Sequence, residues 1–179
     1  MNEYVQEYIS HMLIYIRNDM VEVMQYLPYG IIVMVVWMLL FHTKKSRSVS
    51  LFLGYIVIVV FITLFSREEG TRRSLDFTLF STLGTWSRAD AYLLENILLF
   101  VPIGSMLPFV WRKCRNLLYC LLSGSVLSVL IEGLQYFTKR GYTQLDDIIA
   151  NTVGAIIGFL IVSVGRFIYT RVYRLFYKG

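Results

Sequence analysis

The sequence predicts an all-α protein, an integral membrane bundle of five transmembrane helices preceded by an N-terminal amphipathic helix. The first observation is composition: 56% of the 179 residues are hydrophobic and the mean hydropathy is +0.59, so too few polar side chains remain to cover a soluble domain. The second is a series of five apolar runs, each near the ~20 residues that a membrane span needs. The third is an alternation of basic and mixed-charge segments between those runs.

The elements follow in order along the chain. Residues 1–25 place apolar side chains three or four apart with polar ones between them, which predicts an amphipathic helix that lies at the membrane surface or packs on the bundle. The rest, 26–179, is one transmembrane domain, with spans at about 26–41, 49–65, 91–111, 117–137 and 148–168. The last span contains Gly154, Ala155 and Gly158, small residues that let two helix backbones approach closely.

The charges predict how these spans cross the membrane. Ten Lys and Arg residues lie in the segments 42–48, 112–116 and 166–179, which contain no acid. The other seven bases, with ten of the twelve acids, lie in the segments 1–25, 66–90 and 138–147. These two sets alternate across the five spans, and cytoplasmic segments carry the excess of Lys and Arg. We therefore expect the N-terminus outside and the C-terminus inside.

Polar side chains gather where the third, fourth and fifth spans meet the predicted outer surface. Glu132 and Gln135 close the fourth span, Asp147 and Asn151 open the fifth, and Arg140 lies between them. Ionisable side chains within membrane spans are costly and mark functional sites by default. The helical spacing puts Ser125, Ser128, Glu132 and Gln135 on one face of the fourth span, and Asp147, Asn151, Gly154 and Gly158 on one face of the fifth. We expect these faces to form a polar pocket that opens outward.

The same residues carry a resemblance to a known family. The segment ENILLFVPIGSMLPF at 95–109 is followed by EGLQ at 132–135, a basic residue at Arg140, and DDIIANTVGAIIG at 146–158. These ordered motifs resemble the VanZ-like membrane proteins, whose family is named for an accessory protein of glycopeptide-resistance operons. Arg67, just after the second span, fits an arginine that such proteins carry there, whereas LDFTLFSTL at 75–83 departs from the family pattern.

The resemblance implies a multi-pass protein of the bacterial cytoplasmic membrane with a role in the cell envelope. VanZ-like proteins are associated with reduced susceptibility to teicoplanin and related lipoglycopeptides. The leading hypothesis is a pocket that binds, and in its stronger form modifies, a lipid-linked envelope precursor or a glycopeptide-related anionic molecule. The alternative is a non-catalytic module that binds lipid or stabilises a partner. The sequence leaves open whether any reaction is catalysed, and it leaves the oligomeric state open.

Each polar residue has a candidate role and a structural alternative. Three carboxylates are candidates for proton transfer, namely Glu95, Glu132 and Asp147. The candidate ligand-binding residues are Arg67, Asn96, Gln135, Arg140, Asp146 and Asn151, with the two arginines as anchors for an anion. Alternatively, Glu132 and either Arg140 or Arg67 neutralise each other and hold helices together. In the same alternative, Asp146 and Asp147 complement a helix N-terminus and Asn151 joins two helices.

The remaining expectations concern cofactors and partners. We expect membrane lipids as partners and no nucleic acid, because the net charge of +5 is explained by the membrane orientation. No cofactor is expected, although a cluster of carboxylates could hold a divalent cation such as Mg²⁺ or Ca²⁺. A histidine-based zinc site is disfavoured because His11 and His42 are predicted to lie on opposite sides of the membrane.

Overall fold

The structure is a computed structural model that describes residues 3–65, 75–76, 78, 87–140 and 143–177. Within these ranges the chain forms the helices α1 (Glu3–Val23), α2 (Leu27–Leu40), α3 (Lys44–Phe65), α4 (Ser87–Val110), α5 (Leu117–Thr138) and α6 (Leu145–Tyr177). Two 3₁₀ turns, η1 (Met24–Tyr26) and η2 (Arg112–Arg115), precede α2 and α5, and two short strands are β1 (Leu75–Asp76) and β2 (Thr143–Gln144).

Five helical segments in the described part of the chain are long and apolar enough to cross a membrane. They are Glu3–Leu40, Lys44–Leu64, Asp90–Val110, Leu117–Thr138 and Leu145–Phe176. This confirms the predicted all-α membrane bundle of five spans, with α1 ahead of α2 at the N-terminus. The chain is therefore a multi-pass membrane protein.

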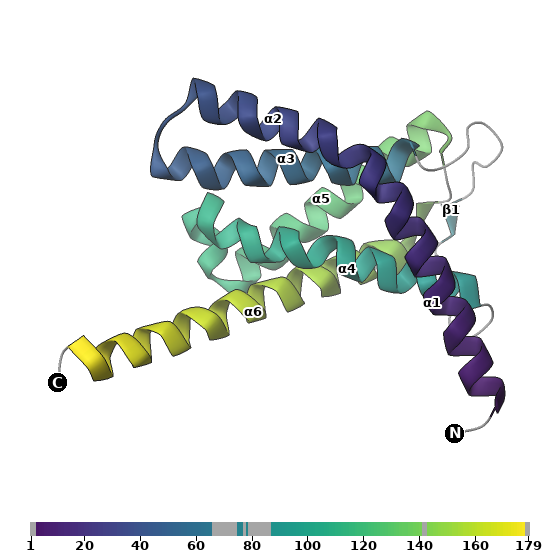
Figure 1. Ribbon diagram of the computed structural model, residues 1–179. Coiled ribbons are helices and arrows are strands. Elements are labelled where there is room, and N and C mark those ends of the chain that lie inside the picture. The colour runs from purple at the N-terminus through teal and green to yellow at the C-terminus, as the bar shows by residue number, and fades with distance from the viewer. Residues whose placement is uncertain (1–2, 66–74, 77, 79–86, 141–142, 178–179) are drawn as a thin grey trace.

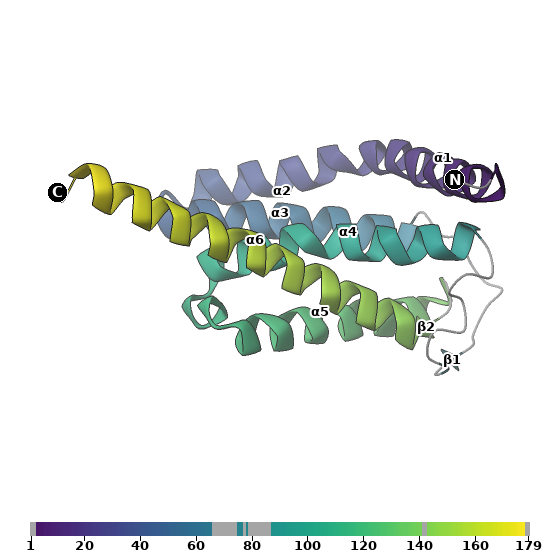
Figure 2. The same cartoon turned by 90° about the horizontal axis from the view of Figure 1, so that it is seen from below.

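The bundle has two different ends (Figures 1 and 2). The turn between α2 and α3, the turn between α4 and α5, and the C-terminus of α6 lie together at one end, which we call the basic end. The strands β1 and β2 lie at the opposite end, which we call the β end. The three segments predicted to be cytoplasmic thus share one end of the molecule, while the orientation of that end in a membrane stays a prediction.

Helices α4 and α6 form the most extensive contact in the bundle. Their backbones are in direct contact at two glycines of α6. A Cβ atom at Gly154 would collide with the carbonyl of Ile97, and one at Gly158 would collide with the carbonyl of Val101. The small residues predicted in the fifth span therefore do permit close approach, and the partner is α4. A buried hydrophobic core surrounds this contact, formed by Val59, Phe100, Ile103, Leu107, Cys114, Cys120, Ile131, Ala155 and Phe159.

The β end is tied together by backbone contacts. Helix α5 ends at Thr138 and is followed by Lys139, whose left-handed backbone (φ 56°) reverses the chain. The N–H of Arg140 then donates to the carbonyl of Gln135 at 3.0 Å. Strand β1 then pairs in parallel with β2, Leu75 opposite Thr143. This pairing joins the connection between α3 and α4 to the connection between α5 and α6.

The helices extend beyond the apolar runs. Helix α3 begins at Lys44 rather than at 49, and α6 continues to Tyr177 rather than ending at 168. Lys and Arg are good helix formers, so a helix need not end where hydropathy falls. Helix α6 has 33 residues, a length of about 50 Å against a hydrocarbon layer of ~30 Å. Its last turns consequently project past the other helices (Figure 2).

Candidate functional site

Seven polar side chains of α4, α5 and α6 are buried in the half of the bundle nearest the β end, and we call them the polar cluster. They come from three helices: Asn96 on α4, Ser128, Glu132 and Gln135 on α5, and Asp146, Asp147 and Asn151 on α6. Glu132 and Gln135 are 3% and 1% exposed, so they lie as deep as the apolar core. Burial of this kind among membrane helices is expensive unless hydrogen bonds or charges compensate for it.

Side-chain hydrogen bonds join the three helices across the cluster. Asn96 Nδ2 on α4 donates to Asp147 Oδ1 on α6 at 2.7 Å. Asn151 Nδ2 on α6 donates to Ser128 Oγ on α5 at 2.9 Å. One turn away, the hydroxyls of Ser125 and Thr152 lie 3.1 Å apart. Asn151 therefore meets Ser128 of α5, as the helical spacing predicted. The other members of the same α6 face, Asp147, Gly154 and Gly158, contact α4 instead.

Two of the predicted ligand-binding residues also contact α3. Gln135 Nε2 donates to the carbonyl of Thr63 at 3.1 Å, and Arg140 Nη1 donates to the carbonyl of Leu64 at 2.9 Å. These carbonyls belong to the last turn of α3, where no N–H of the same helix is in position to bond them. A positive charge at a helix C-terminus also complements the helix dipole. Gln135 and Arg140 therefore cap α3, a role that the sequence did not predict.

Two buried amide oxygens in the polar cluster have no donor among the described residues. They are Gln135 Oε1 and Asn151 Oδ1, and the nitrogen of each amide is already bonded to the protein. A buried acceptor that finds no donor costs about 1–3 kcal/mol. Water, or a ligand hydroxyl or ammonium group, is the chemistry that would satisfy these two oxygens.

Three of the predicted site residues are carboxylates on α4 and α6. Glu95 is half-buried on α4, next to Asn96, and Asp146 and Asp147 lie in the first turn of α6. Their carboxylates complement the dipole at that helix start, as the structural alternative requires. Arg67 lies outside the described residues. Tyr55, which the sequence analysis did not select, donates its hydroxyl to the carbonyl of Leu99 at 2.9 Å and joins α3 to α4.

The described residues do not form a metal centre of the usual acidic kind. No three His, Cys, Asp or Glu side chains within the described ranges come close enough together to hold a metal ion. A divalent cation bound here would need backbone, amide or hydroxyl oxygens, or ligands from outside those ranges. Mg²⁺ and Ca²⁺ do accept such oxygens, but they usually include carboxylates as well.

The chain is similar to known proteins of one family. The sequence matches the VanZ/LLP1 family over residues 29–168. It is similar to Protein VanZ of Enterococcus faecium, with 27% identity over 121 residues that cover 64% of this chain and 72% of that protein. No solved structure matches the chain significantly. The matched range contains all of the polar cluster, all of α4 and α5, and α6 as far as residue 168. The chain therefore belongs to the VanZ/LLP1 family.

Proposed function

We propose that this VanZ-like protein acts in the cell envelope from the bacterial cytoplasmic membrane. In this proposal the polar cluster binds a lipid-linked or glycopeptide-related molecule that carries an anionic group. The observation that supports it is the pair of buried amide oxygens on Gln135 and Asn151 that have no protein donor among the described residues. Such acceptors fit a ligand that brings hydroxyl or ammonium donors into the bundle.

The charges of the cluster suggest how such a ligand would be oriented. Carboxylate and amide oxygens on Glu132, Asp147 and Asn151 would accept hydrogen bonds from the sugar or amine part of the molecule. Its phosphate or carboxylate would meet Arg140, which follows the C-terminus of α5. A guanidinium carries five N–H donors in a planar fork that matches a phosphate or carboxylate, and Nη1 of Arg140 donates to the carbonyl of Leu64. Association with teicoplanin resistance would follow from binding either the drug or an envelope precursor.

A reaction at this site would need proton transfer. Glu132 and Asp147 are the deeper candidates, and Glu95 lies nearer the surface of α4. Asp147 already accepts a hydrogen bond from Asn96, which orients its carboxylate. Glu132→Gln keeps the shape of the side chain and removes its carboxyl group. A function that needs the carboxylate is lost in this variant, whereas packing that needs only the volume of the side chain is retained.

The test is native mass spectrometry of the full-length protein extracted from bacterial membranes. Wild type is compared with Glu132→Gln and with Glu7→Gln, which changes the same charge on an exposed turn of α1. We expect an envelope molecule to remain bound to wild type and Glu7→Gln and to be lost from Glu132→Gln, with thermal unfolding midpoints that agree within a few degrees. An unliganded wild type, or a bound molecule retained equally by Glu132→Gln, would overturn the proposal.

The alternative function is a non-catalytic module that binds lipid or stabilises a partner. The contacts that favour it are the bonds of Gln135 and Arg140 to α3, because these use proposed ligand-binding residues to hold helices together. If this alternative holds, Glu132→Gln lowers the thermal unfolding midpoint, and any loss of function follows from that loss of stability. The same thermal unfolding measurement distinguishes the two, since the leading proposal requires loss of ligand without loss of stability.

A further inference from the structure

The projecting part of α6 forms a groove with α4 at the basic end of the bundle. The groove is lined by Phe109 at the end of α4 and by five residues of α6: Val162, Gly165, Arg166, Tyr169 and Thr170. Its volume is about 490 Å³. At Gly165 a Cβ atom would meet nothing within 4 Å, so this part of the helix surface is open. The groove lies far along α6 from the polar cluster, which occupies the opposite half of that helix.

One side of the groove is basic. The Arg166 guanidinium carbon lies 5.9 Å from the centre of the Phe109 ring, which holds the charge beside an apolar wall. Thr170 and Tyr169 add hydroxyl groups to the same lining. The segments 111–116 and 166–177, which border the groove in sequence, carry six Lys and Arg residues and no Asp or Glu. An anion entering here would meet positive charge without a competing carboxylate from these segments.

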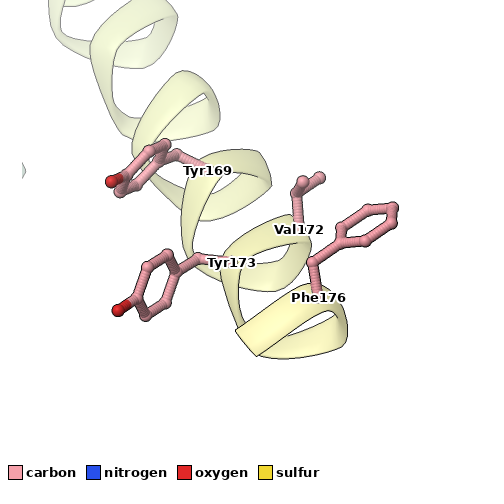
Figure 3. Close-up of a pocket in the computed structure, with 4 residues that line it drawn as sticks. All are labelled: Tyr169, Val172, Tyr173 and Phe176. Carbon is pink, nitrogen blue, oxygen red and sulfur yellow. The ribbon is translucent and has the colours of Figure 1, made fainter. Parts of the chain in front are cut away.

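The rest of the projecting helix has the side chains of a membrane interface. Tyr169 and Tyr173 project from one side of its last turns, and Val172 and Phe176 project from another (Figure 3). The four side chains border a second shallow hollow on this helix. Tyrosine is enriched at the level of lipid headgroups, where one end of the ring is apolar and the other is hydrated. The groove therefore lies where headgroup phosphates are expected.

We propose that the groove between α4 and α6 is a binding site for an anionic phospholipid, with the phosphate on Arg166 and an acyl chain along Phe109 and Val162. Such a lipid would contact both the apolar and the polar residues that line the groove, whereas a free phosphate would contact only the polar ones. Arginine matches phosphate geometry with paired N–H donors. Basic pockets beside membrane helices recognise anionic headgroups in this way. The site is separate from the polar cluster and does not depend on the function proposed for it.

The experiment measures lipid binding to the full-length protein in neutral detergent by native mass spectrometry, with phosphatidylglycerol and phosphatidylcholine as probes. We expect phosphatidylglycerol to bind at least about tenfold more tightly than phosphatidylcholine. Arg166→Gln should weaken it about fivefold, since one basic residue near headgroups contributes about 1 kcal/mol. Lys45→Gln makes the same charge change on α3 at the basic end and should leave binding within twofold. Added inorganic phosphate should not compete.

A second pair of variants tests the groove without changing charge. Gly165→Leu fills the open space and should abolish the preference for phosphatidylglycerol. Gly133→Leu is its matched control, because that glycine of α5 also has nothing within 4 Å of its Cβ position and lies outside the groove. The proposal fails if Lys45→Gln weakens binding as much as Arg166→Gln, which would indicate diffuse surface attraction. It also fails if Gly165→Leu binds like wild type, or if inorganic phosphate displaces the lipid.

Discussion

At the β end, carboxyl and amide side chains are buried between helices, whereas at the basic end the charged side chains are exposed around them. Glu132 and Gln135 lie among apolar side chains and are 3% and 1% exposed. By contrast, Arg112, Lys113 and Arg115 of η2 are exposed, as are the arginines in the last turns of α6. The same helices thus place carboxylates and amides inside at one end and cations outside at the other.

The difference indicates which end contributes to helix association and which to the surroundings of the protein. Buried polar groups in a membrane need partners on neighbouring helices, and Asn96, Asp147, Asn151 and Ser128 provide them for one another. Exposed cations need no protein partner because water and lipid phosphates solvate them. Substitutions that remove a hydrogen bond between helices at the β end should therefore change stability, and those that remove an exposed cation at the basic end should change contacts with lipid.

The largest effect is expected where the two helix backbones touch. In Gly158→Leu the side chain would collide with the carbonyl of Val101, which neither helix can move cheaply. We expect a loss of at least about 3 kcal/mol in the free energy of unfolding, at the upper end of the range for overpacking. SDS titration of the protein in mild detergent measures it. Gly165→Leu, seven residues along the same helix, should unfold like wild type, and equal losses in the two variants would contradict the contrast between the ends.

A smaller effect is expected for the bond between α4 and α6. Removal of the Asn96 side chain takes one donor from Asp147, and we expect Asn96→Ala to cost about 2 kcal/mol. Hydrogen bonds between membrane helices average about 0.6 kcal/mol and reach about 1.7. For the pair Asn96 and Asp147 we expect a coupling free energy near about 1.5 kcal/mol, because the acceptor is a buried carboxylate and the bond is 2.7 Å long.

A double-mutant cycle with Asp147→Ala measures this coupling directly. Each single variant and the double variant are unfolded under the same conditions, and the non-additive part is assigned to the pair. A coupling below about 0.3 kcal/mol would be within the error of additivity and would contradict a role for the bond in holding α4 against α6.

Much of this organisation could be predicted from the sequence because it depends on local periodicity. Hydropathy indicated the five spans, and a spacing of three and four residues put Ser128 on the face that meets Asn151. Gly154 and Gly158 indicated close approach for a reason that is also local, since small residues in a helix leave a flat face. These inferences required no knowledge of which helices are neighbours.

The contacts with α3 could not be predicted for two physical reasons. Gln135 bonds to Thr63, 72 residues earlier, and Arg140 bonds to Leu64, 76 residues earlier. In both cases the acceptor is a backbone carbonyl, which every residue has, so no side chain of α3 identifies the partner. The projection of α6 could not be predicted for a different reason, because hydropathy indicates where a span ends but not where its helix ends, and this helix continues through Arg171 and Arg174.

The smallest effect is expected at the basic end, at the start of α5. There the side chain of Asn116 accepts a hydrogen bond from the N–H of Leu118 at 2.9 Å, in an exposed position. Asn116→Ala should cost about 1 kcal/mol, the usual value for a lost N-cap, and less than Asn96→Ala because water can replace the lost acceptor. Asn116→Asp retains a capping oxygen and should restore the free energy of unfolding to within about 0.5 kcal/mol of wild type. If Asn116→Ala proves the more damaging of the two alanine variants, then burial of polar contacts at the β end is not what distinguishes the ends of this bundle.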